Sequence, residues 1–298
     1  MKILLATSEL YPYSKTGGLA DMVAALGKTL ARQGHQVGIV TPLYGFIRGR
    51  GDCAGLRKLD WVLNIMLDWR KISGEVYQLD TPDGVTVYFI DQQDFFDRPG
   101  IYQENGRDYH DNADRYIFFS KAVVNLAQYL PWKPEMVHVH DWQTAIVPLL
   151  LRHARSQGEL DHPIATCLTI HNLVYQGVYS SNVFAMTNMP WGYFNPSETE
   201  FYGNFNFLKT GIVFADQLTT VSPRYAQEIQ GQEYGANLNG VLNKRADSLT
   251  GILNGADYDV WNTSNNPSLA AGYSIDDMSG KARDKAALQE RMGLPVEP

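Results

Sequence analysis

The chain has 298 residues, of which 44% are hydrophobic and 19% charged, and its formal net charge is −7. This length allows one large α/β domain or two small ones, with enough apolar residues for a sizeable core. Because no basic block offsets the negative balance, nucleic acid and anionic membranes are poor candidates for the main partner, whereas a neutral polymer is compatible with the charge.

The cysteine count and the first residues bear on the compartment. Cys53 and Cys167 are the two cysteines, and such sparse use is typical of free thiols in a reducing compartment rather than of a disulfide framework. The chain runs directly into a predicted strand, so we expect neither a signal nor a transit segment. No uninterrupted apolar run is long enough to span a bilayer.

The first predicted elements are a strand and a helix. Residues Lys2 to Thr7 form a short apolar run, which is typical of a buried strand. After a loop, apolar residues recur at helical spacing until Gly34 supplies a stop. The residues of this apolar stripe are Leu19, Val23, Leu26 and Leu30.

The loop between them reads Lys-Thr-Gly-Gly-Leu-Ala-Asp, residues 15–21. Gly17 and Gly18 fall at the helix N-terminus, where backbone N–H groups and the positive end of the helix dipole point outward. Lys15 adds a full positive charge. This arrangement predicts an anion site, most simply one for phosphate. On chemistry alone, a tight turn with a solvated lysine is an equal alternative.

The second strand, Gln36 to Thr41, ends at Pro42. A strand–helix–strand opening implies a right-handed crossover and a parallel sheet. Dinucleotide-binding domains often carry an acidic residue at the end of this strand and a G-x-G-x-x-G motif after the first one. Neither is present in this sequence. Both absences weigh against an NAD-dependent enzyme.

Two strand-like runs, Ile72 to Leu79 and Val85 to Ile90, are joined by Thr-Pro-Asp-Gly. This strong turn signal predicts a hairpin inserted into the βαβ series, at an edge of the sheet. The Gly- and Asp-rich residues 94–108 read as a long loop, and long loops in compact domains are often functional.

The remaining periodic segments continue the alternation of helices and strands. We expect helices over Asn112–Tyr129, Thr144–Arg155, Phe205–Phe214 and Lys281–Gly293, and strands over Met136–His140, Ile164–Ile170, Gln217–Val221 and Leu249–Leu253. Residues 172–206 resist assignment and are rich in aromatic side chains. Such rings offer flat faces on which sugars stack, and the alternative is a loop that packs on itself.

Polar residues follow strand after strand at the C-terminal end. In open parallel sheets ligands bind in the crevice at that edge, so we expect these side chains to converge with the glycine-rich loop. They are Ser8-Glu9, His140-Asp141, His171-Asn172, Ser222 and Asn254.

His138 and His140 stand two residues apart on one predicted strand. We expect them to alternate across the strand, on opposite sides, so that only one faces the crevice. His140 with Asp141 invites a metal site, which we reject because helical ligand spacing or a second cluster is missing. Neither a Walker A loop nor a nucleophile elbow occurs, so ATP hydrolysis and serine hydrolase chemistry are not expected.

The heptapeptide at Lys15 closely resembles the signature of bacterial glycogen synthases and plant starch synthases. Shorter matches follow in the family order: Pro-Gly-Ile-Tyr at 99–102, His-Asp-Trp-Gln at 140–143, His-Asn-Leu-Val-Tyr-Gln at 171–176 and Leu-Asn-Gly at 253–255. Met22 replaces a common valine, and Gln143 stands where some members carry His, so that position receives no role. Each short motif is weak, and the set is highly specific.

The resemblance implies a retaining glucosyltransferase that moves glucose from ADP-glucose to the non-reducing end of an α-1,4-glucan, with no metal and no cofactor. Lys15, Gly17 and Gly18 would take the donor phosphates, and Asp21 would hold the loop or meet the sugar. His171 would steady the developing oxocarbenium charge, through its backbone or its ring. The residues implied to line the sugar and acceptor site are Tyr102, Asp141, Trp142, Asn172 and Asn254. We also count Asp141, with His171, as catalytic.

The resemblance also implies the N-terminal domain of a two-domain GT-B glycosyltransferase. We assign residues 1–298 to this Rossmann-like domain, with residues 281–298 leading toward an absent C-terminal domain, and expect the chain to be nearly inactive alone. The alternative is a non-catalytic glucan-binding module, and a sucrose-type glycosyltransferase is a weaker one. UDP-glucose stays possible as donor. The implied location is the bacterial cytosol, with the plastid stroma as the alternative.

Overall fold

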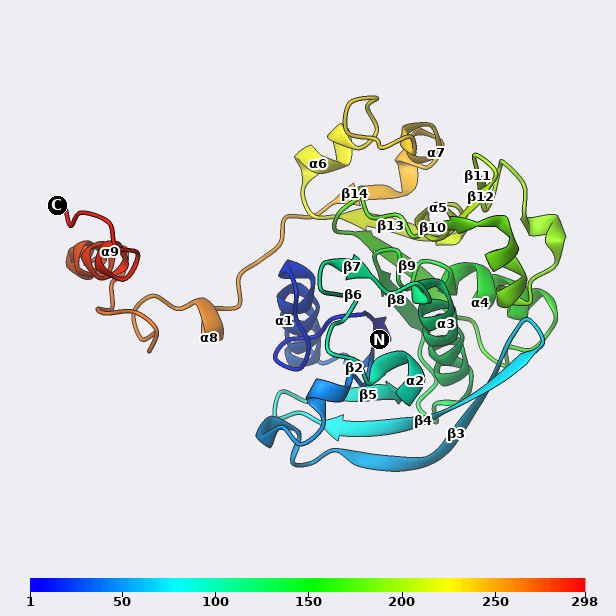
Figure 1. Cartoon of the computed structure of the whole chain (residues 1–298), viewed down its shortest axis with the longest axis horizontal. Helices are drawn as coiled ribbons and strands as arrows, with labels where there is room; N and C mark the ends of the chain where they lie inside the picture. The colour runs from blue at the N-terminus through cyan, green and yellow to red at the C-terminus, as the bar shows by residue number, and fades with distance from the viewer. Residues whose placement is uncertain (298) are drawn as a thin grey trace. The chain divides into compact units, whose positions relative to one another are not determined.

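The computed structural model describes residues 1–297, and the chain divides into two compact units, Met1–Asn254 and Gly255–Pro298. The first unit is built on a nine-stranded sheet, which Figure 1 follows from β14 at the top to β3 at the bottom. In spatial order its strands are β14 (Leu249–Gly251), β13 (Gln217–Thr220), β9 (Ala165–Ile170), β8 (Met136–His140), β1 (Lys2–Ala6), β2 (Gln36–Pro42), β5 (Val85–Asp91), β4 (Arg70–Asp80) and β3 (Arg57–Leu67).

Neighbouring strands from β14 to β5 run parallel, whereas β4 and β3 are antiparallel to their neighbours. Consecutive residues Ile3 to Ala6 of β1 are all buried, which means that both faces of the sheet are covered. The expected α/β, Rossmann-like parallel sheet is therefore confirmed.

Helices flank the sheet on both sides, as in other Rossmann-like domains. The principal ones of the first unit are α1 (Gly18–Arg32), α2 (Gln93–Phe96), α3 (Asn112–Tyr129), α4 (Val147–Ser156), α5 (Phe207–Phe214), α6 (Pro223–Glu228) and α7 (Asn239–Asn243). Gly27 of α1 packs against Ile39 and Leu5 on one face, and Trp132, just after α3, approaches Gly38 on the other. Side chains on the two faces alternate along each strand, which explains this division.

The inserted hairpin is confirmed in place but is larger than expected. β5 is a full member of the parallel part, paired with β2, and the antiparallel edge is formed by β4 together with β3. We predicted no strand at β3, although its residues from Leu63 to Leu67 alternate between buried and exposed positions. That period of two is the signal that would have found it.

The aromatic segment after β9 forms its own small core. It contains β10 (Val178–Ser180), β11 (Glu200–Phe201) and β12 (Asn204–Asn206), with the 3₁₀ helices η3 (Ser181–Thr187) and η4 (Trp191–Tyr193). Phe184 and Phe205 are fully buried, and their rings meet edge to face with centroids 5.2 Å apart. The self-packing alternative therefore holds for the centre of this segment. Its β12 also replaces the first residues of the helix that we expected from Phe205.

The second unit contains α8 (Tyr258–Trp261) and α9 (Ser279–Arg291). The latter matches the expected helix over Lys281–Gly293 to within two residues. Its Asp284 accepts a hydrogen bond from the Ala271 amide at 2.8 Å. Throughout residues 1–297, helices with the length and apolar character of a membrane span are absent.

A close approach between two elements gives a stability test. A Cβ on Gly211 of α5 would lie 2.7 Å from the Ala145 carbonyl oxygen, which is backbone and cannot swing aside. We expect Gly211→Ala to destabilise the fold by about 1–3 kcal/mol, measured by urea unfolding. Gly240 of α7 meets nothing within 4 Å, so Gly240→Ala is the matched control and should be neutral or slightly stabilising. Equal effects of the two substitutions would contradict this packing.

Candidate active site

Three neighbouring strands bring most of the predicted residues to one edge of the sheet. β9, β8 and β1 are adjacent and parallel, and His171, Asp141 and Glu9 follow their C-terminal ends. Parallel strands end on the same side, so these side chains share one edge with the glycine-rich loop. The expected convergence is therefore present at these strands.

Glu9 is the hub of this edge, although the sequence analysis gave it no role. It is buried, with an exposed fraction of 3%. Its Oε2 accepts from the amides of Thr16 at 2.5 Å and Gly17 at 3.1 Å. Its Oε1 accepts from the hydroxyls of Thr16 at 2.6 Å and Tyr102 at 2.8 Å. One carboxylate thus joins the end of β1 to the glycine-rich loop and to the loop of Tyr102.

The predicted anion site is therefore partly filled by the chain itself. Gly17 is the N-cap of α1, and the Glu9 carboxylate takes its amide, which is where an external anion was expected. The first turn still carries the amides of Gly18 and Leu19, whose acceptors do not come from within the helix. A Cβ on Gly17 or Gly18 would meet nothing within 4 Å, so the space beside this backbone is open.

Lys15 and Asp21 pair with each other at the mouth of the loop. The Lys15 Nζ lies 2.7 Å from Asp21 Oδ2, and both side chains are partly exposed. The ammonium also lies 5.7 Å from the centroid of the Tyr11 ring. An exposed pair of this kind is weak and exchanges partners readily. Lys15 can therefore exchange Asp21 for another anion.

Tyr102 is held from several sides. Its hydroxyl lies 2.7 Å from Ser8 Oγ as well as beside Glu9. The Ser8 carbonyl accepts from the Tyr44 hydroxyl at 2.9 Å, and Tyr44 continues to Tyr116 at 3.3 Å. Burial raises the pKa of Tyr102 well above its usual range, so the phenol stays protonated at neutral pH.

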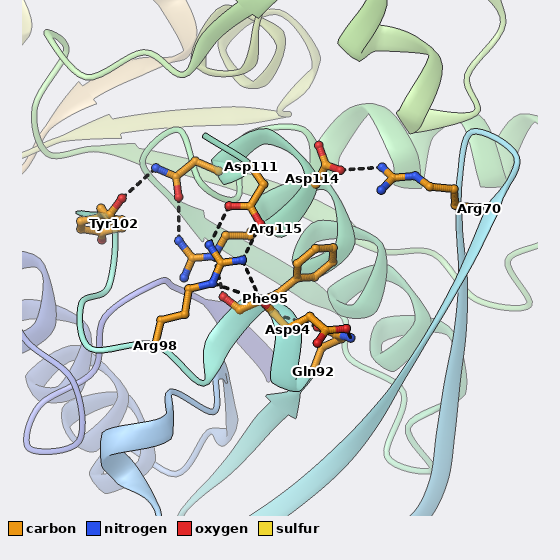
Figure 2. A network of polar contacts seen from close by, with 10 residues as sticks. Arg70, Gln92, Asp94, Phe95, Arg98, Tyr102, Asp111, Asp114 and Arg115 are labelled. Carbon is orange, nitrogen blue, oxygen red and sulfur yellow. Dashed lines mark hydrogen bonds and ion pairs between the residues drawn. The ribbon is translucent and has the colours of Figure 1, made fainter. Parts of the chain in front are cut away.

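A buried network fixes the backbone of the Tyr102 loop (Figure 2). Asn112 at the start of α3 donates to the Tyr102 carbonyl at 2.9 Å and accepts from Arg115 at 2.6 Å. Arg115 is completely buried, and its Nε donates to the Phe95 carbonyl at 2.6 Å. Beside it, Arg98 makes a two-pronged ion pair with Asp111, at 2.7 and 2.5 Å.

The buried guanidinium of Arg115 is surrounded mainly by aromatic rings. Within residues 1–297 no carboxylate forms a direct ion pair with Arg115, since the nearby Asp111 pairs with Arg98. The Arg115 guanidinium lies over the rings of Tyr109, Tyr116 and Phe96, at 4.9, 5.4 and 5.5 Å from their centroids. Ring faces, the Phe95 carbonyl and the Asn112 amide oxygen thus stand in place of a direct ion pair, while Asp111 acts on the charge from farther away. A single cation ties α2, α3 and the Tyr102 loop together.

Asp141 follows β8 in a left-handed backbone conformation, with φ at 55°. Its Oδ1 accepts from the backbone amide of His171 at 2.8 Å and faces that of Asn172 at 3.4 Å. Burial raises the pKa of Asp141 to about 7, and these amides oppose the rise. The carboxyl is therefore poised near neutrality, which is common at functional sites.

Three neutral histidines with tilted rings pack together next to Asp141. The rings of His138 and His140 lie 4.3 Å apart, and His140 Nδ1 lies 3.2 Å from His171 Nε2. Our expectation that His138 and His140 face opposite sides is wrong, because residues two apart on a strand share a face. Burial lowers the pKa of His138 and of His171 to about 4, and that of His140 well below its usual range.

Two predicted residues lie apart from this cluster. Trp142 is only 8% exposed, and its ring packs against Tyr116 and Phe207 with centroids 5.0 and 6.0 Å away. It supports the site from beneath. Asn254 follows β14, which is separated from β9 by β13, so it lies off the centre. Asn172 is exposed, and its side chain accepts from the Val174 amide at 3.1 Å.

The part of the chain that the structure describes contains no cluster of three or more His, Cys, Asp or Glu side chains that could hold a metal. The sequence analysis placed Glu9 at this edge without giving it a role, and it missed Asn112 and Arg115. A polar-charged start to an otherwise apolar helix, Asn-Ala-Asp-Arg-Tyr-Ile-Phe-Phe from residue 112, was the available signal for the last two.

A Rossmann-like sheet with a glycine-rich loop after β1 and polar residues at its strand ends has the fold of the N-terminal domain of a GT-B glycosyltransferase. A family model described as the starch synthase catalytic domain matches residues 2–244. The chain therefore belongs to that family, which confirms the resemblance.

Individual relatives agree with this assignment. A glycogen synthase of Opitutus terrae is 43% identical over 295 residues, covering 99% of this chain and 61% of the relative. One from Syntrophotalea carbinolica is 41% identical over 297 residues, covering 100% of this chain and 61% of the relative. The chain thus spans about 61% of the length of these curated relatives.

A solved structure shares the fold over the whole chain. It is the catalytic domain of starch synthase IV from Arabidopsis thaliana, described as bound to ADP and acarbose. The TM-score is 0.88 at 34% identity, and the match covers 100% of this chain and 60% of that one.

The Glu9 contacts predict the protection of two amides. Glu9→Ala removes the acceptor of the Thr16 and Gly17 N–H groups, and hydrogen bonds to charged groups contribute about 1.5–3 kcal/mol. We expect hydrogen exchange at these two amides to accelerate about tenfold or more, with little change in β2. Lys15→Ala, which leaves Glu9 in place, is the control. Unchanged exchange in Glu9→Ala would show that the carboxylate does not hold this loop.

Two buried groups predict opposite pH dependences of stability. The pKa of His138 is lowered to about 4 in the folded state, from about 6.5 in the unfolded state. His138 therefore contributes stability above about pH 6.5, and this contribution is lost as the pH falls toward 4. His138→Gln should therefore lose less stability than the wild type between pH 7 and pH 5. Asp141, raised to about 7, contributes stability at low pH that is lost as the pH rises through 7.

In the wild type, the contribution of Asp141 to the free energy of unfolding decreases as the pH rises. Asp141→Asn removes this contribution, so the free energy of unfolding of the variant should rise more steeply from pH 5 to pH 7 than that of the wild type. Urea unfolding midpoints at pH 5, 6 and 7 measure both slopes. If the two variants shift the slope in the same direction, one of the two pKa assignments is wrong.

Proposed function

We propose that this chain forms part of a retaining glucosyltransferase that moves glucose from ADP-glucose to the non-reducing end of an α-1,4-glucan. The observation that carries the proposal is the meeting of the Lys15 loop with Asp141 and His171 at adjacent strand ends. The solved relative described with ADP and acarbose supports a nucleotide and a glucan analogue as ligands of this fold.

The donor diphosphate is assigned to the Lys15 loop. Lys15 leaves Asp21 for the phosphates, and the open first-turn amide of Gly18 adds hydrogen bonds and the helix dipole. Gly17 acts differently, because its amide is held by Glu9. It shapes the loop and keeps a side chain from filling the space that the donor enters. When the donor is absent, Asp21 pairs with Lys15 and holds the loop. When the donor binds, Asp21 releases Lys15.

The reacting glucose is assigned to the edge at Asp141 and His171. In a transfer with an oxocarbenium-like transition state, positive charge develops at the sugar, and fixed dipoles and carboxylates stabilise it. Burial keeps His171 neutral, with a pKa of about 4. The uncharged ring and its backbone carbonyl can therefore stabilise the developing charge, which an imidazolium would repel. Asp141, whose pKa is raised by burial to about 7, contacts sugar hydroxyls or the charge itself.

The remaining assignments concern the sugar and the acceptor. Tyr102 presents a protonated phenol next to Glu9, and exposed Asn172 offers an amide to sugar hydroxyls. Trp142 acts beneath the site, since its ring is covered by other aromatic rings. Asn254 contacts a more distant part of the substrates. The proposal includes neither a metal nor a cofactor, and it includes no nucleic acid or membrane partner.

The chain spans about 61% of the named relatives, so we propose that transfer also needs residues outside it, from a second Rossmann-like domain that supplies the nucleotide pocket. We further propose a bacterial cytosolic setting, because the named curated relatives are bacterial. The second candidate is a glucan-binding module without turnover. It is favoured by exposed rings such as Tyr175, at 65%, beside the site.

Labelled glucose incorporation into glycogen tests the proposal. We expect this chain, when it is extended by the second domain of a relative, to transfer glucose from ADP-glucose. The chain alone should be far less active, and the extended form should be far less active with UDP-glucose than with ADP-glucose. Lys15→Ala in the extended form should lower kcat/KM by about 10²-fold, because a charged contact to the donor is lost. Lys244→Ala, an exposed lysine at the end of α7, is the control.

Equal donor affinity in Lys15→Ala and the wild type would reject the donor assignment. An inactive extended form that still binds maltooligosaccharide would leave the glucan-binding module.

A further inference from the structure

His140 is a buried histidine at the candidate active site that has no part in the proposed transfer. It is the last residue of β8, and its exposed fraction is 0%. Burial lowers its pKa well below the usual range, so its imidazole is neutral at pH 7. A neutral imidazole has one N–H donor and one nitrogen that only accepts, and the hydrogen bonds of the two nitrogens decide which is which.

The two ring nitrogens of His140 have different surroundings. Its Nδ1 lies 3.2 Å from Nε2 of His171. Its Nε2 is buried and has no hydrogen-bond partner within residues 1–297. The ring of His138 lies alongside, with its centroid 4.3 Å away and its plane tilted by 32°. Because these two rings are closer to parallel than to edge-on, an N–H in the plane of His140 does not point at the face of His138.

This difference between the two nitrogens assigns the proton of His140. With the proton on Nε2, a buried N–H donor would have no acceptor, whereas with the proton on Nδ1 only a lone pair is left without a partner. Buried N–H groups without a partner are rarer in proteins than buried acceptors without one. Nδ1 of His140 therefore donates a hydrogen bond, and Nε2 of His171 accepts it.

The tautomer of His171 follows from that of His140. Burial lowers the pKa of His171 to about 4, so this ring is also neutral at pH 7. Because its Nε2 accepts from His140, its one ring proton lies on Nδ1. This Nδ1 has no hydrogen-bond partner among the described residues and, unlike Nε2 of His140, it is not a buried atom. His171 thus offers an N–H donor to a ligand.

Backbone contacts keep the two histidines in this geometry. Thr144 Oγ1 accepts from the His140 amide at 2.8 Å and donates to the His140 carbonyl at 2.9 Å. The His171 amide donates to Asp141 Oδ1 at 2.8 Å. The facing nitrogens of the two rings are therefore held together by the ends of the adjacent strands β8 and β9.

We propose that His140 is a positioning residue, which fixes His171 in the tautomer that presents Nδ1–H, a hydrogen-bond donor, to a ligand at the strand-end edge. The inference rests on the proposed function for the identity of that ligand, a sugar whose oxygens accept such a bond. Of the ring and the carbonyl of His171, the carbonyl is then the group that faces the developing positive charge, because the N–H edge of the ring would repel it.

Nitrogen-15 NMR of the histidine-labelled chain at pH 7, without ligand, measures the tautomer, because protonated and bare imidazole nitrogens resonate far apart. We expect His171 to carry its proton on Nδ1, and the signals that disappear in His171→Gln assign this ring. His140→Phe keeps a ring and removes the donor, so it should shift His171 toward the Nε2–H form. His140→Asn, whose amide N–H replaces Nδ1–H, should restore the wild-type tautomer. His138→Gln, which leaves the pair intact, is the control and should not change it.

Transfer by the form extended with a second domain gives a readout that a purely structural role would not change in this way. His140→Phe should lower kcat about tenfold, as expected for the loss of one hydrogen bond in the site. The KM for ADP-glucose should stay near the wild-type value, because the donor diphosphate is assigned to the Lys15 loop. His140→Asn should recover most of the kcat.

The outcomes separate this inference from the proposed function. A wild-type spectrum with His171 protonated on Nε2 overturns the inference without any variant, so a failure of His140→Phe to fold cannot hide that result. The wild-type tautomer in a folded His140→Phe overturns it as well. Equal losses of kcat in His140→Phe and His140→Asn, with different tautomers, reject the positioning role. A tautomer set by His140 in a chain whose extended form transfers no glucose upholds the inference while the proposed function fails.

Discussion

The buried carboxylate of Glu9 is the constraint on which the candidate site depends. A charge at 3% exposure is costly unless it is fully paired, and here two amides and two hydroxyls satisfy it. Because those donors come from the glycine-rich loop and from Tyr102, folding of either loop requires the other. The positive end of α1 also stabilises the carboxylate. Loop order and helix dipole are thus coupled through one side chain.

Charged side chains and neutral histidines occupy different parts of the same sheet edge. Lys15, Asp21 and Glu9 carry charge around the loop, while burial keeps the three neighbouring histidines next to Asp141 uncharged. In the transfer that we propose, an anionic donor and a sugar that becomes positive in the transition state require different surroundings. The arrangement provides both within the ends of three adjacent strands.

Much of the fold could be predicted from local signals. The strands of the parallel sheet and α3, whose bounds agree exactly, follow from periodicity and from Gly and Pro stops. The site was harder, because Glu9 and Arg115 act through partners 7 to 93 and 3 to 20 residues away in the sequence. The motif at Lys15 located the loop. That the Glu9 carboxylate occupies the amides of this loop could not be predicted, since the sequence after β1 is the same whether the carboxylate faces solvent or the loop.

The two margins of the sheet restrict how another protein can attach to it. The outer strand β3 begins with exposed Arg57 and Lys58 and has an irregular register before Val62. The opposite margin, β14, is three residues long. Charged, irregular or very short border strands resist the addition of a further strand from another molecule. Association by strand addition is therefore disfavoured at either margin.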